Sequence, residues 1–371
     1  MIRNSLVPLP LAQLPWRIIL LVTAITGFGL VVLYSAAGGS LRPWALGQGI
    51  RFALFLALAI ALSRLDEARL KAATMPAYAA LLVALVLVEL IGAVSGGGQR
   101  WLDLGIVRLQ PSELMKPVIV LVLARFYDLV PAGEIRTLRA VWPALLLIAV
   151  PAAMILVQPD LGTATMVAAG GVAVMFLAGL PLRLFVGAIA AAVPLGAAAW
   201  ASLRDYQRNR VLIFLDPDVD PLGKGYHISQ SKIAIGSGGI AGKGFLHGTQ
   251  SHLAYLPEGH TDFVFATMAE EWGLLGGLVL IAAFLALVWW ALRVAMHAPT
   301  RFARLTAAGL SATIFFYVAV NLMMVMGLAP VVGIPLPLVS YGGSAVMTVM
   351  IVVGILAALD RSRHSHRPRF G

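Results

Sequence analysis

Residues 16–36 read WRIILLVTAITGFGLVVLYSA, and no charged side chain follows Arg17 in this stretch. A helix of this length spans roughly 30 Å, the thickness of the hydrocarbon core of a bilayer, and pairs its own backbone groups there. The run is longer than the apolar core of a cleavable signal peptide, and many similar runs follow it. We therefore expect a retained membrane helix rather than a signal sequence.

Nine further apolar segments follow, at residues 44–63, 75–95, 113–130, 139–157, 162–179, 182–201, 271–294, 304–328 and 342–360. Together they predict an all-α polytopic membrane protein, a bundle of ten transmembrane helices in a single domain that covers residues 1–371. A stretch of mixed polarity, residues 202–270, is expected to form a large extracytoplasmic loop between the seventh and eighth helices. No internal repeat of the kind found in many transporters is visible.

The composition agrees with a lipid-embedded chain and excludes several kinds of chemistry. Hydrophobic residues make up 60% of the sequence and charged residues only 12%, whereas soluble domains carry roughly 25% charged residues. The absence of cysteine excludes disulfides, iron–sulfur clusters, thiolate zinc sites and a cysteine nucleophile. The seven histidines form no H-E-x-x-H pair, so we expect no built-in cofactor, although a loosely bound Mg²⁺ or Mn²⁺ remains compatible.

The distribution of basic residues predicts the orientation. With a cytoplasmic N-terminus, most of the 27 Lys and Arg residues fall on the inner side, so the positive-inside rule places both termini in the cytoplasm and the long loop outside. The basic tail, residues 361–371, would then meet anionic headgroups. The net charge of +10 follows mainly from this asymmetry, so nucleic-acid binding need not be invoked. Two charges within predicted spans, Arg51 and Glu89, are expected to neutralise each other.

The first polar cluster on the predicted outer side begins at residue 98. Its Arg100 and Arg108 suit a pyrophosphate, because guanidinium groups bind phosphate oxygens in pairs, although ordinary solvated loop charges fit the same pattern. Farther along, Glu113 and Lys116 are three residues apart on one face of a helix that starts near Pro111. They predict either an internal ion pair or part of a polar substrate cavity at the outer mouth of the bundle.

The second polar cluster is the link QPDLGT at residues 158–163. Its proline and glycine are typical of a tight turn. Asp160 stands at the membrane surface just before a helix, so it is expected either to cap that helix or to line a catalytic pocket.

The third cluster is the long loop. It starts with basic residues that include Arg210, and its Gly-rich part, residues 235–244, is expected to supply flexible backbone near a bulky ligand. That part lacks the G-x-x-x-x-G-K-[ST] pattern of a nucleotide-binding loop. Glu270 and Glu271, which we expect to open the eighth span, would be favoured by the positive end of a helix.

The end of the loop concentrates groups suited to acid–base chemistry. The polar side chains in residues 248–263 include Gln250, Ser251, Glu258, His260, Thr261 and Asp262. A carboxylate at such a partly desolvated water interface can have a raised pKa and act as a general base, which makes Asp262 the candidate. The alternative is structural, with Thr261 or Asp262 capping the following helix.

Five ordered motifs resemble the SEDS family of membrane glycosyltransferases, which includes RodA and FtsW. They are residues 100–105 (RWLDLG), 110–113 (QPSE) with Lys116, 158–163 (QPDLGT), 256–258 (LPE) with 260–263 (HTDF), and 333–344 (GIPLPLVSYGGS). The motifs GTQS at residues 248–251 and QPDLGT at residues 158–163 are similar to those of the elongation-type, RodA-like branch. The resemblance spans essentially the whole chain. Gly259 and Ala269 are small departures that remove no residue needed for the reading.

The resemblance implies a glycan polymerase of the bacterial cytoplasmic membrane, which builds peptidoglycan for cell elongation and rod shape on its periplasmic face. Its substrates would be lipid II and the nascent glycan on undecaprenyl pyrophosphate, joined by inverting β-1,4 transfer. Its partners would be a class B penicillin-binding protein, which is a transpeptidase, and the elongation machinery. The resemblance also implies that Asp262 is the essential carboxylate, and we expect Ser340 and Ser344 of the last motif to belong to the substrate site.

Two other functions remain open from the sequence. A lipid II flippase or another transporter would use the same basic outer pocket and the same intramembrane pairs. A noncatalytic scaffold for the penicillin-binding protein would not need Asp262. Glycan formation and lipid II translocation in proteoliposomes would separate these functions.

Overall fold

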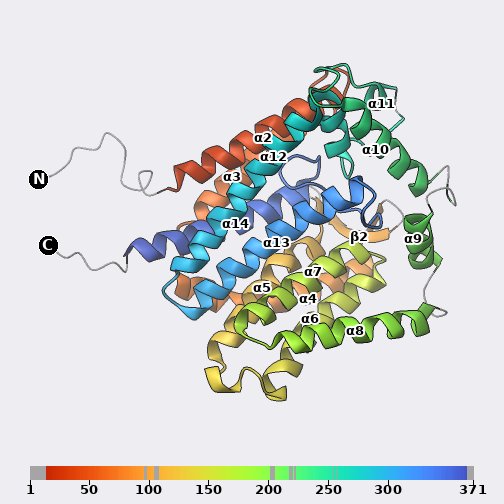
Figure 1. Ribbon diagram of the computed structural model, residues 1–371. Helices are drawn as coiled ribbons and strands as arrows, with labels where there is room; N and C mark the ends of the chain where they lie inside the picture. Colours follow the sequence, from red (N-terminus) through yellow and green to blue (C-terminus); the bar gives the residue numbers. More distant parts are fainter. Residues whose placement is uncertain are drawn as a thin grey trace, which may run out of the picture.

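The computed structural model describes residues 14–95, 98–103, 108–200, 205–216, 220, 223–253, 255–256 and 258–365. Ten helices in these ranges coincide with the ten predicted segments: α2 (Trp16–Ala36), α3 (Ala45–Leu62), α4 (Glu67–Ile91), α5 (Pro111–Leu129), α6 (Leu138–Val157), α7 (Leu161–Ala178), α8 (Leu182–Ala199), α12 (Val264–His297), α13 (Arg301–Val325) and α14 (Gly343–Ser365). The polytopic all-α prediction is confirmed, because these helices form the bundle in Figure 1.

Eight helices in the described part of the chain are long and apolar enough to cross a membrane. The other two are α5, which carries four charged residues, and α8, whose described apolar part is one residue short of 18. Large apolar side chains stay exposed along the spans, among them Leu20, Ile50 and Val279, as lipid-facing positions require. The chain is thus a multi-pass membrane protein, and the number of ten spans stays a prediction.

Local signals in the sequence set the helix ends. Asp66 begins α4 by accepting a hydrogen bond from the amide of Arg69 at 2.8 Å, and Thr300 begins α13 in the same way through Ala303 at 3.1 Å. Pro111 occupies the first turn of α5, where its missing N–H costs nothing. The starts of α5 and α13 fall within three residues of the predicted ones, whereas α4 begins eight residues before the predicted residue 75.

A small antiparallel sheet joins α4 to α5, and its first strand takes up residues 93–95, which were predicted as the end of the third span. Its strands are β1 (Ala93–Ser95), β2 (Gly98–Asp103) and β3 (Arg108–Leu109), in the order β1-β2-β3. The register pairs Ala93 with Trp101 and Asp103 with Arg108. The start of α2 and the end of α14 lie at one end of the bundle, and β2 lies toward the other, so the first polar cluster is held away from both described chain ends (Figure 1).

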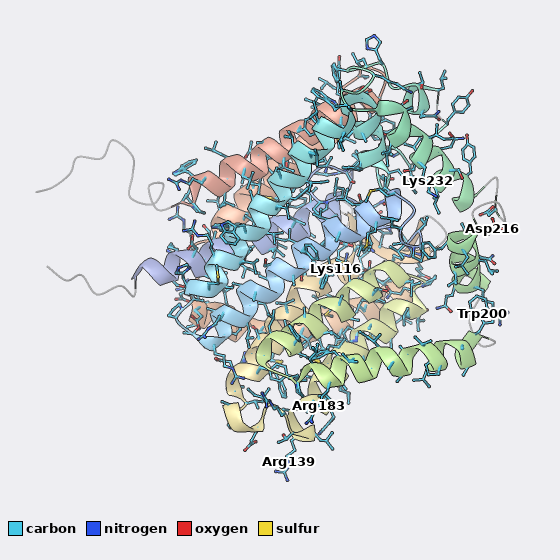
Figure 2. All side chains as sticks on the ribbon, viewed as in Figure 1. Lys116, Arg139, Arg183, Trp200, Asp216 and Lys232 are labelled. Atoms are coloured by element: carbon cyan, nitrogen blue, oxygen red, sulfur yellow. The ribbon has the colours of Figure 1, made fainter. Side chains whose placement is uncertain are left out.

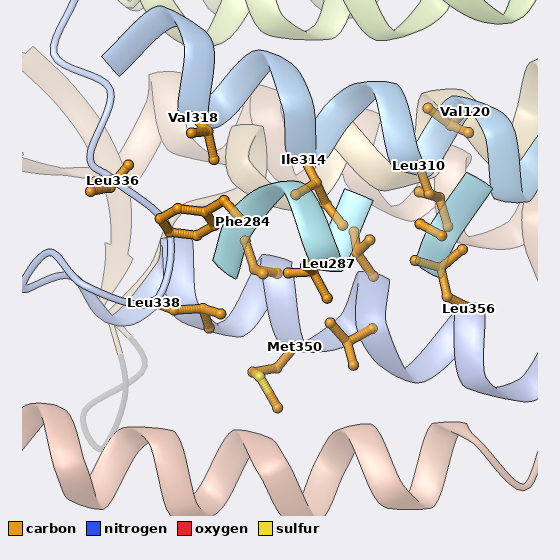
Figure 3. Close-up of a cluster of buried hydrophobic side chains, with 14 of the residues drawn as sticks. Val120, Phe284, Leu287, Leu310, Ile314, Val318, Leu336, Leu338, Met350 and Leu356 are labelled. Carbon is orange, nitrogen blue, oxygen red and sulfur yellow. The ribbon is translucent and has the colours of Figure 1, made fainter. Parts of the chain in front are cut away.

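The core lies where α12, α13 and α14 pack together. Figure 3 shows Phe284 and Leu287 from α12 against Ile314 from α13 and Met350 from α14. Leu336 and Leu338, from the irregular segment between α13 and α14, cover the outer end of this cluster. That segment is therefore tied into the core, which gives the loops beside it a rigid support.

The predicted loop of residues 202–270 contains much helix. It holds α9 (Asp205–Leu215), α10 (Lys224–Gly238) and α11 (Thr249–His252), and α12 begins at Val264 rather than at the expected residue 271. The backbone of α12 breaks at Gly273, with φ 64° and ψ −162°. Glu270 and Glu271 therefore end the first segment of α12, and the expectation that they open a helix is wrong.

The Gly-rich part is packed tightly rather than left as flexible backbone. A Cβ at Gly238 would strike the carbonyl of Ala269, and one at Gly242 would strike the carbonyl of Glu271. The amides of Lys243 and Gly244 donate to the carbonyls of Glu270 and Glu271, each at 3.0 Å. The glycines thus let two backbones approach closely at the break in α12.

Candidate functional site

Asp262 lies in a turn, residues 258–263, that leads directly into α12. Phe263 is the N-cap of this helix and makes no side-chain capping bond. Neither Thr261 nor Asp262 caps the helix, so the structural alternative for these two residues is wrong. The carboxylate is half-buried and lies beside Gly333, where an added Cβ would be 3.4 Å from Asp262 Oδ2.

Two neighbouring segments hold this turn. Asn321 Nδ2, from α13, donates to the carbonyl of Asp262 at 2.8 Å and to the carbonyl of Ile334 at 2.7 Å. The amide of Tyr341 donates to the carbonyl of His260 at 2.8 Å. The turn is therefore fastened to the irregular segment between α13 and α14.

His260 stacks on Trp44, with ring centroids 4.1 Å apart and planes 10° from parallel. Burial lowers the pKa of His260 from its ordinary value of 6.5, and the nearby Glu258 carboxylate opposes this shift. Burial therefore favours the neutral form of this imidazole. The side chain of Glu258 is exposed and accepts a hydrogen bond from the hydroxyl of Thr261.

Glu113 and Lys116 form a buried ion pair on α5, with Nζ 2.5 Å from Oε1. Tyr317 of α13 closes the group: Lys116 donates to its hydroxyl at 2.8 Å, and that hydroxyl donates to Glu113 Oε2 at 2.6 Å. Figure 2 shows Lys116 inside the bundle. The internal pair predicted from the sequence is confirmed, with a tyrosine as its third member.

Asp160 caps α7 by accepting from the amide of Thr163 at 3.0 Å, and its other oxygen accepts from Gln110 Nε2 at 3.0 Å. The capping alternative is confirmed. Arg100 donates to the carbonyls of Gln158 and Pro159, at 3.2 and 2.6 Å. Arg100 thus fastens β2 to the link before α7, which uses two of its N–H donors.

Arg108 is exposed on β3 and meets Asp103 of β2 at 3.3 Å. This is the solvated arrangement left open by the sequence. The guanidinium stays accessible, since 67% of its side chain is exposed.

Ser340 helps to shape the segment before α14. Its hydroxyl accepts from the amide of Leu336 at 2.8 Å, and its carbonyl accepts from Gln48 Nε2 at 2.7 Å. Gln48 Oε1 also accepts from the amide of Gly342 at 3.2 Å. Ser344 is buried, and its hydroxyl makes no hydrogen bond within the described residues. These contacts give Ser340 a structural role and leave the role of Ser344 as a prediction.

Gln250 lies at the start of α11, where its backbone N–H donates to Glu270 Oε1 at 3.0 Å. Glu270 is buried and also pairs with Lys243 at 2.6 Å. The side chains of Arg210, on α9, and Ser251, on α11, lie outside the described ones, so these two predictions stay as they are.

Arg51 and Glu89 do not neutralise each other. The guanidinium of Arg51 lies over the ring of Tyr341, with its Cζ 4.8 Å from the centroid. Glu89 is exposed on α4, and no ion pair joins the two among the described residues. The aromatic face at the start of α14 holds the cation instead.

An apolar cavity of about 550 Å³ lies elsewhere, between α2 and α3, with Tyr34 and Phe245 in its wall. It contains none of the predicted site residues. In the described parts of the chain, no three His, Asp or Glu side chains gather as a metal site. The candidate site is therefore the turn that carries Asp262 and the segments that contact it.

The fold brings several predicted residues together around residues 332–334. Asp262 lies at Gly333, and Gly162 packs its backbone against the carbonyl of Val332, which brings the Asp160 link to the same place. Tyr317 and Ile334 share a small buried cluster with Met166, which adds the Glu113–Lys116 pair. Ser344, Gln250 and the exposed Arg108 have no described contact with this group.

Tyr317 and Asn321 were not predicted from the sequence. Both are polar residues in an otherwise apolar span, four positions apart and therefore on one face of α13. Buried polar side chains in a membrane helix require partners, so this spacing was the available signal.

Comparisons with known proteins identify the family of this chain. The family model for the cell cycle proteins FtsW, RodA and SpoVE matches residues 15–365. The chain is 45% identical to the peptidoglycan glycosyltransferase MrdB of Escherichia coli K12, over 94% of this chain and 93% of that protein. It is 30% identical to the peptidoglycan glycosyltransferase RodA of Treponema pallidum, over 93% and 97% of the two chains.

Solved structures show the same fold. A chain of a peptidoglycan synthase complex that coordinates polymerization and crosslinking superposes with a TM-score of 0.83 at 35% identity, covering 95% of this chain and 98% of that one. The rod shape determining protein RodA of Thermus thermophilus superposes with a TM-score of 0.70 at 31% identity and the same coverage. With the motifs around Asp262 in place on this shared fold, the chain belongs to the FtsW/RodA/SpoVE family, the SEDS proteins.

Proposed function

We propose that this chain is a peptidoglycan glycosyltransferase that polymerises glycan strands for cell elongation, with Asp262 as its catalytic base. Two relatives that share almost its whole length are named for this activity. The position of Asp262 is the observation that supports its assignment as the catalytic base. Its half-buried carboxylate stands beside Gly333, in a turn that Asn321 and Tyr341 hold through the carbonyls of Asp262 and His260.

We infer a direct, inverting transfer. The donor is the growing glycan on undecaprenyl pyrophosphate, and the acceptor is the 4-hydroxyl of the GlcNAc unit of lipid II. Asp262 takes the proton of this hydroxyl as its oxygen attacks the anomeric carbon of the donor, which gives a β-1,4 bond and releases the pyrophosphate. The reaction needs no covalent enzyme intermediate.

The leaving pyrophosphate needs charge stabilisation rather than protonation. Arg108 supports this role because its guanidinium is exposed, and Arg100 lies on the neighbouring strand with N–H donors left over. Lys116 supplies positive charge from within the bundle, where Glu113 and Tyr317 hold it. A loosely bound Mg²⁺ or Mn²⁺ would assist at the phosphates, but no step here depends on one.

We propose further that the enzyme works in the bacterial cytoplasmic membrane with both termini inside and Asp262 facing the periplasm. The start of α2 and the end of α14 lie at the same end of the bundle, as this orientation requires (Figure 1). The superposing synthase complex coordinates polymerization with crosslinking, which supports a class B penicillin-binding protein as the partner of this chain.

The test is polymerisation of purified lipid II by the full-length protein in proteoliposomes. Asp262→Asn keeps the shape of the side chain but lacks a base, so we expect glycan synthesis to fall by at least 100-fold while the protein purifies and melts as the wild type does. Glycan synthesis at the wild-type rate would overturn the base assignment. Lipid II translocation without polymerisation by the wild type would overturn the enzymatic function and support a flippase.

A further inference from the structure

Asn321 makes an unusual contact for a residue inside a membrane helix. Its side chain is fully buried near the end of α13, and its single NH₂ group donates to two carbonyls, those of Asp262 and Ile334. These carbonyls belong to segments that meet only in the folded protein. One side chain therefore joins the turn that carries the proposed base to the backbone beneath its carboxylate.

The hydrogen-bond chemistry fixes the orientation of this amide. An NH₂ group has two hydrogens, and both are used here. Turning the amide over would place its oxygen against two carbonyl oxygens and leave both without a donor, at a cost that a buried site does not tolerate. The contact thus sets the spacing between residues 262 and 334. Gly333, whose φ of 72° favours glycine, lies next to Ile334 and beside the Asp262 carboxylate.

The helix that presents Asn321 is itself anchored. One turn earlier on the same face, Tyr317 is bound to both Lys116 and Glu113 of α5. The rest of the turn has its own supports, because Thr267 Oγ1 donates to the carbonyl of Gly259 at 3.0 Å and Tyr341 holds His260. Loss of the Asn321 contact should therefore leave the turn attached but release residue 262.

We propose that Asn321 is a positioning residue for Asp262: it holds the backbone of the base at a set distance from residues 333–334, so that the carboxylate reaches the acceptor hydroxyl. This inference rests on the proposed function of Asp262. It predicts a selective loss of turnover, because a displacement of about 1 Å at a reacting group can reduce the rate by on the order of 100-fold.

The test measures kcat and KM for lipid II polymerisation in Asn321→Ala and in the isosteric Asn321→Asp, which replaces the donors with acceptors. We expect kcat to fall by on the order of 100-fold while KM changes by less than about threefold. Asn321→Ser is the milder variant, because it keeps one hydroxyl donor. If the other two variants do not fold, its kcat tests the positioning role.

The matched control is Ser311→Ala on the same helix. Ser311 is also buried, and its hydroxyl donates to the carbonyl of Val288 at 3.2 Å. This hydrogen bond does not involve the turn that carries Asp262. Ser311→Ala should lower the melting temperature and retain the wild-type kcat. Wild-type kcat in the folded Asn321 variants, or an equal loss in Ser311→Ala, would refute the positioning role. An active Asp262→Asn would instead refute the proposed base, so the two failures are distinguishable.

Discussion

Replacing Lys116 by Met is the sharpest test of the buried group on α5 and α13. Lys116 is 1% exposed and Glu113 is 5% exposed, so the substitution leaves a carboxylate in the bundle without its cation. Removing one partner of a buried pair typically costs about 3–5 kcal/mol. Tyr317 still donates to Glu113 at 2.6 Å, so we expect the lower end, about 3 kcal/mol.

A double-mutant cycle separates the attraction between Glu113 and Lys116 from the cost of leaving one buried charge unpaired. Glu113→Gln combined with Lys116→Met replaces both charges, and such replacements are often neutral, so we expect the pair to lie within about 1 kcal/mol of the wild type. The exposed pair of Arg108 and Asp103 provides the control. Arg108→Met should lower the free energy of unfolding by less than about 1 kcal/mol. The assay is the free energy of unfolding in mixed micelles. Additive losses, or a loss below about 1 kcal/mol for Lys116→Met alone, would refute the reasoning.

Two further predictions concern the turn and the packing beneath it. Because the pKa of His260 lies below 6.5 in the folded state, the unfolded chain takes up the proton first, so stability present above pH 6.5 is lost as the pH falls. Between pH 7.5 and pH 5.5, the melting temperature should fall more in the wild type than in His260→Gln. Equal falls in melting temperature would contradict the lowered pKa of His260. Gly162→Ala should destabilise the protein because its Cβ would strike the carbonyl of Val332, whereas Gly187→Ala, with no atom within 4 Å, should be neutral or stabilising by up to about 1 kcal/mol. Equal melting temperatures for these two variants would show that the backbone of Gly162 does not pack tightly against the carbonyl of Val332.

The site was only partly readable from the sequence. The ion pair of Glu113 and Lys116 and the cap at Asp160 follow from local spacing, and both predictions are confirmed. The kink at Gly273 was missed because an apolar run looks the same whether its helix is straight or broken. Arg51 was paired with Glu89 on charge alone, and the structure places it over Tyr341 instead.

The amino-acid sequence by itself predicted the apolar helices and the candidate base Asp262, because apolar length and ordered motifs are properties of single segments. Tertiary structure alone decided which groups surround that carboxylate. Asn321 joins residues 262 and 334 only after α13 has packed beside the two loops, and Tyr317 meets Glu113 across more than 200 positions of the chain. Hydrogen bonds of this kind depend on distances between segments, and a linear pattern does not contain those distances.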